Sequence, residues 1–255
     1  MQLQPVLFGL IAALSLLMGP DLAPTGTLRA SFLMTNPVQG RVDPQTGAVT
    51  GPVADLVREI AKRRGVPFTI LPVPDAAAVI DSLKTGRADI GFLAYEAARA
   101  TQVDFSRPYL LMSNGYLVRA DSAIKKSADV DRAGIKVGAV KGQSQEIFVS
   151  ENLKKAHVEV LNTMPADEAV AKMIVSGQLD AFAANRSRME AVARTSPQLR
   201  LLPDNFLVVG QAIVVNKGQT ASLEELNRIL ADVLASNLVK TSIERAQLTG
   251  VEAAK

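Results

Sequence analysis

The sequence of 255 residues contains no cysteine and a single histidine. The absence of cysteine excludes disulfide bonds, thiolate metal sites, a cysteine nucleophile and the residue that carries a bacterial lipid anchor. One histidine, His157, does not supply an imidazole metal site of the usual kind. The chain also lacks a phosphate-binding glycine loop and a nucleophile–base pair. We therefore expect neither a metal nor another cofactor.

Charge of one sign is also not in large excess. Lysine and arginine number 28 against 25 acidic residues, which gives a net charge of +3 with the signs mixed along the chain. This balance does not indicate a nucleic-acid partner. The densest basic run, residues 62–64, closes a predicted helix, where positive charge complements the helix dipole. With 48% hydrophobic and 21% charged residues, the composition is that of a globular protein with one large domain or two small ones.

The longest hydrophobic run lies near the N-terminus, in residues 5–18. It is too short to span a bilayer as a helix and is typical of the hydrophobic region of a secretory signal. The first four residues carry no lysine or arginine and no A-x-A site precedes Gly26, so a buried helix of the fold is the alternative. We interpret residues 1–25 as a signal peptide and expect a periplasmic protein that begins near Gly26.

Two segments repeat one pattern at a distance of 91 positions. Residues 83–90 read LKTGRADI and residues 174–181 read IVSGQLDA. Each combines the end of an apolar helix, a glycine, two further residues, and an aspartate that leads a short apolar strand. Glycine is favoured after a helix because it adopts the left-handed turn. The repeat predicts two similar α/β lobes with a ligand cleft between them, and we expect both segments at the ligand-facing edge.

Hydrophobic periodicity predicts alternating strands and helices. The predicted strands are residues 28–34, 68–73, 90–93, 135–140, 158–161, 179–183 and 207–215. The predicted helices are residues 53–61, 76–83 (capped by Asp75), 96–100, 145–153, 166–176 and 223–234. This alternation predicts an α/β fold with two mixed, mostly parallel sheets flanked by helices. We assign residues 26–118 and 206–255 to lobe 1 and residues 119–205 to lobe 2, with chain crossings near Arg119 and Asn205.

Three features resemble the family 3 extracytoplasmic solute-binding proteins, the amino-acid-type receptors of bacterial ABC importers. They are the motif VDFSRPY at residues 103–109 with Arg99 upstream, the helix end at residues 83–89, and the sequence KGQS at residues 141–144. The resemblance covers residues 26–250 and implies the periplasmic-binding-protein type 2 fold, two lobes joined by hinge strands that close around a ligand. It implies a small carboxylate-bearing solute and a membrane permease as partners. We expect a monomer.

The resemblance also implies how the cleft binds its solute. Arg99 is expected to donate two hydrogen bonds to a ligand carboxylate. The alternative is a surface ion pair with Asp104 or Glu96. Gly142, Gln143 and Ser144 precede a helix, whose free N–H groups form an anion site. Ser144 is expected to cap this helix and contact the ligand, or to cap it only.

The sequence departs from the family pattern at a position that is expected to bind the amino group of the ligand. Asn185 stands where amino-acid receptors usually have the aspartate that binds the α-ammonium. Glu96 is a candidate for the missing negative charge, or a cap of the short helix after the third strand. Tyr95 is a candidate to stack on the ligand, or a core residue, and Asn36 is expected in the pocket wall. The ligand is therefore an amino acid or a related acid without an α-amino group.

Two alternatives to an importer receptor remain at this point. Cyclohexadienyl dehydratases are periplasmic enzymes of the same fold, and an enzyme of that kind needs a general acid, for which Glu96 and Glu146 are the candidates. A solute sensor that docks on a membrane receptor is the second alternative. We interpret the chain as a non-enzymatic, secreted receptor that binds its ligand by reversible cleft closure.

Overall fold

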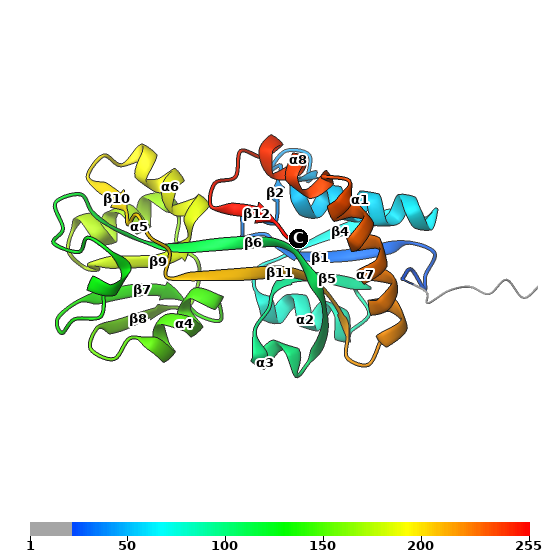
Figure 1. Cartoon of the computed structure of the whole chain (residues 1–255), viewed down its shortest axis with the longest axis horizontal. Helices are drawn as coiled ribbons and strands as arrows, with labels where there is room; N and C mark the ends of the chain where they lie inside the picture. The colour runs from blue at the N-terminus through cyan, green and yellow to red at the C-terminus, as the bar shows by residue number, and fades with distance from the viewer. Residues whose placement is uncertain (1–21) are drawn as a thin grey trace, which may run out of the picture.

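The computed structural model describes residues 22–255 and shows an elongated molecule with two halves, joined by long strands (Figure 1). The strands are β1 (Leu28–Leu33), β2 (Arg41–Val42), β3 (Val49–Thr50), β4 (Phe68–Val73), β5 (Ile90–Ala94), β6 (Val103–Arg119), β7 (Lys136–Val140), β8 (His157–Leu161), β9 (Ala181–Asn185), β10 (Leu199–Leu201), β11 (Leu207–Asn216) and β12 (Val251–Ala253). The helices are α1 (Pro52–Arg64), α2 (Ala76–Lys84), α3 (Ala97–Ala100), α4 (Ser144–Asn152), α5 (Asp167–Val175), α6 (Arg186–Thr195), α7 (Thr220–Ala235) and α8 (Leu238–Arg245), with a 3-10 turn at Ser127–Asp129.

The expected signal peptide lies mostly outside the described residues. Of the part that is described, Leu22 and Ala23 are 2% and 5% exposed and belong to the main hydrophobic core. Cleavage near Gly26 would therefore remove two core side chains. Among residues 22–255, no helix combines the length and the apolar character needed to cross a membrane.

The main sheet is mixed, with parallel strands at both ends. Its order is β4-β1-β5-β11-β6-β9-β7-β8, and β10 and β12 also pair with β6. Strand β1 is parallel to β4 and β5, and β7 is parallel to β8 and β9, whereas the central pairs are antiparallel. The sequence predicted two sheets, but the hydrogen-bonded ladder is continuous. The reason is β6, a strand of 17 residues that pairs with β11 along most of its length and with β9 near its end.

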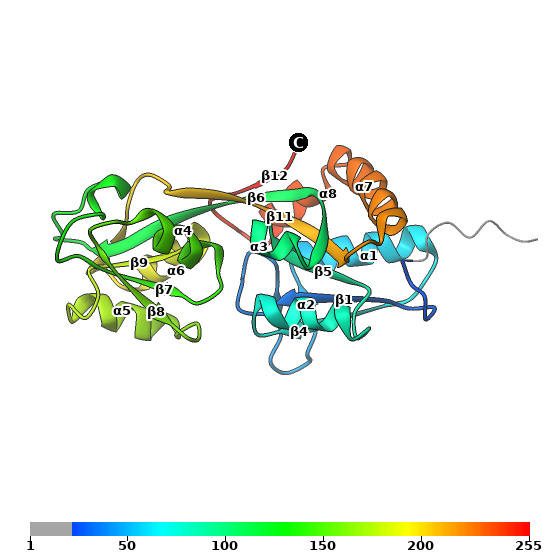
Figure 2. The same cartoon turned by 90° about the horizontal axis from the view of Figure 1, so that it is seen from below.

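The buried side chains nevertheless fall into two groups. Two hydrophobic clusters surround the β4-β1-β5 end, which we call the first half, and two surround the β9-β7-β8 end, the second half. The change from one group to the other falls between Met112 and Tyr116 on β6, and between Phe206 and Ile213 on the returning chain. Figure 2 shows β6 and β11 as the long elements that pass between the halves. The cores are thus separate although the sheet is shared.

The repeated aspartates make the same contacts with the backbone of the neighbouring strand in both halves. The backbone N–H of Arg29 donates to Asp89 Oδ2 at 2.9 Å, and that of Lys136 donates to Asp180 Oδ2 at 2.8 Å. In return, the N–H groups of Asp89 and Asp180 donate to the carbonyls of Arg29 and Lys136 at 2.7 and 2.9 Å. Each aspartate therefore ties the start of one strand to the start of its parallel neighbour, and the two segments are structurally equivalent.

The location expected for this repeat was wrong. Gly86 and Gly177 do adopt left-handed conformations, with φ of +67° and +76°. However, both segments lead into β5 and β9 and so lie at the amino ends of the parallel strands. The residues expected to bind ligand follow the carboxyl ends, at the opposite edge. In open parallel sheets, ligands bind at the carboxyl ends, so the repeat has a structural role here.

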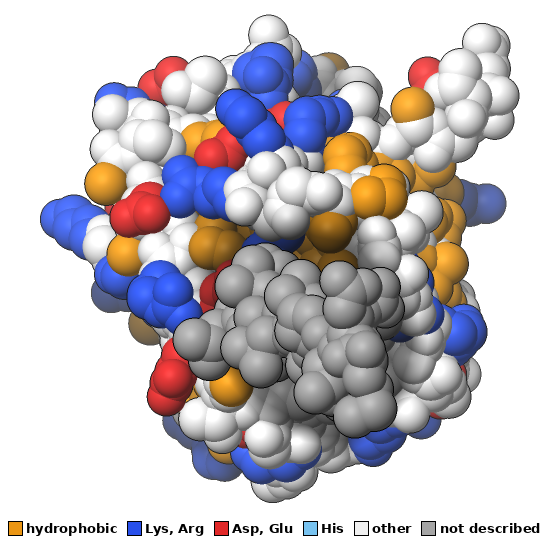
Figure 3. Space-filling view, turned by 90° about the vertical axis from the view of Figure 1, so that its right-hand side faces the viewer, with side chains coloured by type: hydrophobic (Ala, Val, Ile, Leu, Met, Phe, Trp, Pro, Cys, Tyr) orange, Lys and Arg blue, Asp and Glu red, His pale blue; other side chains and the backbone are white. Residues whose placement is uncertain are grey.

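Ion pairs connect helices on the surface of the first half. Arg63 of α1 donates to Glu59 of the same helix at 2.7 Å and to Asp232 of α7 at 2.9 Å, and Arg64 donates to Glu225 of α7 at 2.7 Å. The basic run at residues 62–64 therefore also docks α1 on α7. On the face shown in Figure 3, basic and acidic side chains lie next to one another.

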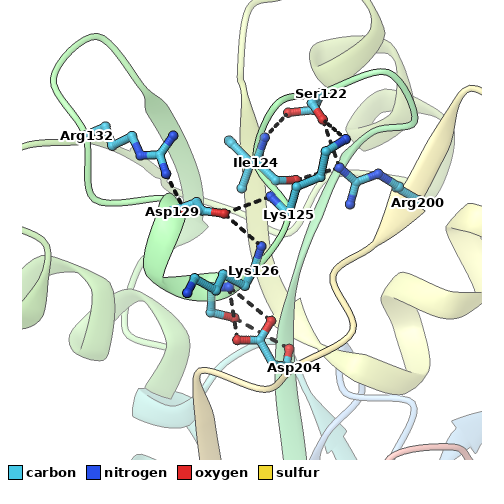
Figure 4. Close-up of polar contacts among 9 residues, drawn as sticks. Ser122, Ile124, Lys125, Lys126, Asp129, Arg132, Arg200 and Asp204 are labelled. Atoms are coloured by element: carbon cyan, nitrogen blue, oxygen red, sulfur yellow. Dashed lines mark hydrogen bonds and ion pairs between the residues drawn. The ribbon is translucent and has the colours of Figure 1, made fainter.

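In the second half, the segment between β6 and β7 is held against the returning chain (Figure 4). Arg200 donates to the carbonyls of Ser122 and Ile124 at 3.0 and 2.5 Å. Asp204 accepts the N–H of Ser127 at 3.0 Å. These contacts connect the chain segment that enters the second half with the segment that leaves it. They lie close to the place where the chain crosses between the halves, and they hold the second half together as one unit.

Candidate ligand-binding cleft

A small cavity lies where the carboxyl ends of β1, β5 and β9 meet the start of α4 and the central strands. Its volume is about 30 Å³. It is lined by Leu33, Thr35, Asn36, Gln39, Ala94, Arg99, Met112, Gln143, Ser144, Gln145, Asn185 and Gln211. Five of the eight predicted site residues are among them. The structure thus brings together segments that are far apart in the sequence and belong to both halves.

Among these twelve described residues, Arg99 alone has an ionisable side chain, and it is 8% exposed. Its Nη1 donates to the carbonyl of Ala94 at 2.8 Å, and its Nη2 donates to the carbonyl of Gly142 at 2.7 Å. The second bond links the first half to the second. Burial lowers the pKa of Arg99 from its usual value, while the charge of Glu96 acts in the opposite direction.

The alternative of a surface ion pair does not hold for Arg99. Within residues 22–255 it forms no salt bridge. Of the two partners in that alternative, Glu96 forms no salt bridge among the described residues, and Asp104 accepts from Lys217 Nζ at 2.7 Å and from the Gly218 N–H at 2.6 Å. A buried guanidinium without a carboxylate partner is costly. Two carbonyl oxygens offset part of this cost, and no carboxylate of residues 22–255 lies within salt-bridge distance of the guanidinium.

The start of α4 differs by one residue from the expectation. Gln143 is the N-cap residue and Ser144 is the first helical residue, and neither side chain makes a capping hydrogen bond. The prediction that Ser144 caps the helix was therefore wrong. The turn comes earlier because Gly142 has φ of +73° and Gln143 is extended. Ser144 is 5% exposed and its hydroxyl lies in the cavity wall without a hydrogen bond to the described residues.

Gly142 contributes its carbonyl to this site and does not itself line the cavity. Its N–H donates to Glu146 Oε2 at 3.0 Å. The other carboxylate oxygen of Glu146 accepts from the Ser150 hydroxyl at 2.9 Å. Glu146, one candidate general acid, is therefore engaged on α4 and is outside the cavity wall.

Asn185 ends β9 and is the N-cap of α6, with 4% of its surface exposed. Its Oδ1 accepts the N–H of Arg188 at 2.9 Å. Asparagine is favoured at this position because its side-chain oxygen satisfies a free N–H of the first turn. The capping role was not predicted, because the sequence analysis did not identify α6. It fixes the amide orientation and leaves Nδ2 as the group available to a ligand.

Tyr95 and Glu96 do not line the cavity. Tyr95 is 56% exposed and makes an edge contact with Phe105 at a ring-centroid distance of 5.1 Å, so it is neither a cavity wall nor a core residue. Glu96 occupies the N-cap position of α3 without a side-chain capping bond. Asn36 is in the wall, and its Oδ1 accepts the N–H of Val38 at 3.2 Å.

Sequence reasoning missed three buried amides of the cavity wall, Gln39, Gln145 and Gln211, and the buried Asn114 that pairs with one of them. Gln39 Oε1 accepts the N–H of Leu33 at 2.9 Å, and Gln39 Nε2 donates to Gln211 Oε1 at 2.9 Å. Gln145 Nε2 donates to Asn114 Oδ1 at 2.5 Å. The available signal was a lone glutamine inside the apolar run of residues 207–215, since a polar residue there needs a buried partner.

The cavity wall offers hydrogen-bonding side chains and one positive charge, that of Arg99. None of the twelve residues is acidic. Among residues 22–255, no group of three or more histidine, cysteine or acidic side chains is placed to hold a metal ion. The arrangement is suited to binding a small anion through N–H donors.

Known proteins resemble the chain in sequence and in structure. The model of the bacterial extracellular solute-binding proteins, family 3, matches residues 32–245. The glutamine-binding protein of Geobacillus stearothermophilus is 27% identical over 173 residues, which cover 66% of this chain and 64% of that protein. The match thus spans less than two thirds of this relative's length.

Two crystal structures have the same architecture. The P235GK mutant of ArgBP from T. maritima superposes with a TM-score of 0.72 at 25% identity, covering 87% of this chain and 95% of that one. The ancestral amino acid-binding protein AncCDT-1, described as a precursor of cyclohexadienyl dehydratase, superposes with a TM-score of 0.73 at 24% identity, covering 86% and 94%. The fold is therefore the α/β fold of the type 2 periplasmic-binding proteins. The chain belongs to family 3 of the bacterial extracellular solute-binding proteins.

Proposed function

We propose that the protein is the solute receptor of an ABC importer and captures a small carboxylate-bearing solute at Arg99. The observation that carries this proposal is the buried guanidinium of Arg99, which has no acidic partner among the described residues and faces the cavity. A carboxylate accepts two parallel N–H bonds from arginine and supplies the missing negative charge.

The position of Arg99 between the two halves supports a closing mechanism. Its Nη2 contacts Gly142 just before α4, in the other half. A ligand carboxylate would take the place of this carbonyl and also meet the free N–H groups at the start of α4. Because such a ligand contacts both halves, it favours the closed arrangement over an open one. A cavity of about 30 Å³ has room for little more than water, so the halves must separate for a solute to enter.

The separation of the two cores supports the proposed lobes. We place the hinge on β6 between Met112 and Tyr116, and on the returning chain between Phe206 and Ile213, where the buried clusters change. These positions refine the crossings expected near Arg119 and Asn205. Lobe 1 then contains β1 to β5 with α7 and α8, and lobe 2 contains β7 to β10.

The remaining features of the proposal rest on the family. Its members are extracellular solute-binding proteins, and we propose a periplasmic, monomeric receptor that delivers its solute to a membrane permease. Cleavage of the signal peptide before Leu22 would keep the two buried residues that follow. None of the twelve described residues that line the cavity is acidic, and we propose binding without catalysis. A sensor would use the same binding site.

A thermal-shift screen tests the proposal. The full protein is melted with amino acids, their 2-oxo analogues and small dicarboxylates, and a ligand of the native state raises the melting temperature. We expect a shift from at least one carboxylate and its loss in Arg99→Ala. Arg87→Ala, a change at an arginine whose side chain is 53% exposed, should keep the shift. An equal shift in Arg99→Ala would refute the assignment.

A further inference from the structure

A second donor points to what the ligand carries besides its carboxylate. Gln211 is fully buried in the cavity wall, and its Nε2 has no hydrogen-bond partner. Buried amide groups are nearly always satisfied, and an unpaired one costs free energy. Gln211 pairs with Ala94 in the β11–β5 ladder, and Arg99 Nη1 binds the carbonyl of Ala94. Gln211 and Arg99 therefore both approach Ala94, and both line the same cavity.

Backbone groups fix the orientation of this amide. The N–H of Leu33 donates to Gln39 Oε1, so the other end of the Gln39 amide is its NH₂ group. That group donates to Gln211 at 2.9 Å and to the carbonyl of Phe92 at 3.2 Å. The Gln211 atom that accepts must be Oε1, because the backbone N–H of Leu33 is a donor only. Nε2 is consequently the end of Gln211 that is left for a ligand.

Asn185 presents the same kind of group from the other half. Its Oδ1 is occupied by the N–H of Arg188, which is again a donor only. Its Nδ2 forms no hydrogen bond within the described residues, and the side chain lies in the cavity wall. Arg99, Gln211 and Asn185 therefore all offer N–H groups, from both sides of the cleft.

An ammonium group finds no negatively charged partner among the residues of this wall. It carries three donors and no acceptor, and it needs negative or strongly accepting groups. None of the lining residues is acidic, and Glu96, whose charge acts on Arg99, does not line the cavity. A carbonyl oxygen, in contrast, accepts two hydrogen bonds and carries no positive charge to be repelled by Arg99.

We propose that the cleft is specific for 2-oxo acids over the corresponding α-amino acids. Arg99 holds the carboxylate, and the amide N–H groups of Gln211 and Asn185 bind the 2-oxo oxygen, while Leu33 and Met112 supply apolar wall for the carbon chain. This inference rests on the proposed function and names the class of its ligand.

Matched acid pairs test the inference by isothermal titration calorimetry on the full protein. Pyruvate, 4-methyl-2-oxopentanoate and 2-oxoglutarate are compared with L-alanine, L-leucine and L-glutamate, which differ from them at one group. We expect at least one 2-oxo acid to bind about tenfold or more tightly than its partner, because the partner leaves the buried donors unpaired.

Two nearly isosteric variants test the residues. Asn185→Asp keeps an oxygen to cap α6 and Gln211→Glu keeps an oxygen to accept from Gln39, while each replaces the free NH₂ group with a carboxylate oxygen. Both should weaken 2-oxo acid binding and reduce or invert the preference for it. Asn162→Asp and Gln178→Glu make the same charge changes at exposed positions and should keep the preference.

The outcomes separate this inference from the proposed function. Tighter binding of amino acids than of their 2-oxo partners, with loss of binding in Arg99→Ala, overturns the inference and leaves the receptor assignment intact. A preference for 2-oxo acids that survives both Asn185→Asp and Gln211→Glu also overturns it. If no carboxylate binds, or if Arg99→Ala binds as well as the unchanged protein, both proposals fail.

Discussion

The two ends of the parallel strands differ in how their polar groups are satisfied. At the amino ends, Asp89 and Asp180 bind the neighbouring strand through both side chain and backbone. At the carboxyl ends, Arg99 has no acidic partner within residues 22–255, and Gln211 Nε2 is buried and unpaired. The same sheet thus has one edge that is complete by itself and one edge that is not.

This difference separates structural from functional polar residues. A charged group whose partners all belong to the protein itself contributes to stability, and its removal lowers the free energy of unfolding. A buried group left without its natural partner costs stability and is retained where it binds something else. The repeated aspartates attracted attention first in the sequence, yet the incomplete edge is where we propose that the ligand binds.

The largest expected effect is on binding, at the incomplete edge. Arg99→Ala should weaken carboxylate binding by about 100-fold or more, because each charge-assisted hydrogen bond contributes about 1.5–3 kcal/mol. Arg99→Lys keeps the charge but not the two parallel donors, so its affinity should lie between those of the unchanged protein and Arg99→Ala. The melting temperature should stay unchanged or rise, since the variants relieve a buried guanidinium. Calorimetry measures the affinity and thermal melting measures the stability. Lower stability with unchanged affinity would show that Arg99 has a structural role, like the aspartates at the other edge.

Asp89→Ala should have the largest effect on stability. It removes the acceptor of the Arg29 backbone N–H and of two guanidinium hydrogen bonds, at 3.0 and 2.6 Å. We expect a loss of about 2–4 kcal/mol in the free energy of unfolding, measured by urea denaturation. Ligand affinity should be unchanged under conditions where the protein is folded. A selective loss of affinity would place function at this edge as well.

Asp180→Ala should cost less than Asp89→Ala, although the two residues are equivalent in the repeat. Asp180 accepts the Lys136 N–H at an exposed position and has no guanidinium partner within residues 22–255. We expect a loss of about 1 kcal/mol in the free energy of unfolding. The same denaturation experiment compares the two variants. A cost equal to that of Asp89→Ala would show that the Arg29 ion pair adds nothing measurable.

Gly86→Ala and Gly177→Ala should have the smallest effects. Both glycines have positive φ, where a Cβ atom is disfavoured, but apart from the glycine and its two chain neighbours no described atom lies within 4 Å of the position that a Cβ would take. We expect each change to cost about 0.5–1 kcal/mol through backbone strain alone, and the costs to add in the double variant because the sites are far apart. Thermal melting of both single variants and the double variant checks this; a marked excess in the double variant would indicate coupling between the halves.

Most of the alternating elements could be predicted because their signals are local. Residues 68–73 and 207–215, for example, match β4 and β11 within one residue. Strand β6 could not be predicted in this way, because its polar and proline-containing start is stabilised by pairing with β11 about 100 residues later. Helix α6 was also missed, since it buries only Met189 and Val192. Their stability depends on tertiary packing.

The site residues divide in the same way, into those with a local sequence signal and those that depend on tertiary packing. Arg99 and Asn185 were found because a motif identifies their positions. Gln39 and Gln211 were not, because their hydrogen bond joins residues 172 positions apart and depends on the completed sheet. The prediction that Ser144 caps α4 failed on a difference of one residue. Such details follow from backbone conformation at Gly142 and Gln143 and are not visible in composition or periodicity.

A crystal structure of the protein with the acid that gives the largest thermal shift tests the account most directly. We predict that the carboxylate accepts hydrogen bonds from the Arg99 guanidinium in place of the Gly142 carbonyl, with a second acceptor of the ligand on Gln211 Nε2. A carboxylate bound away from Arg99, with the guanidinium still on the carbonyls of Ala94 and Gly142, would contradict the account.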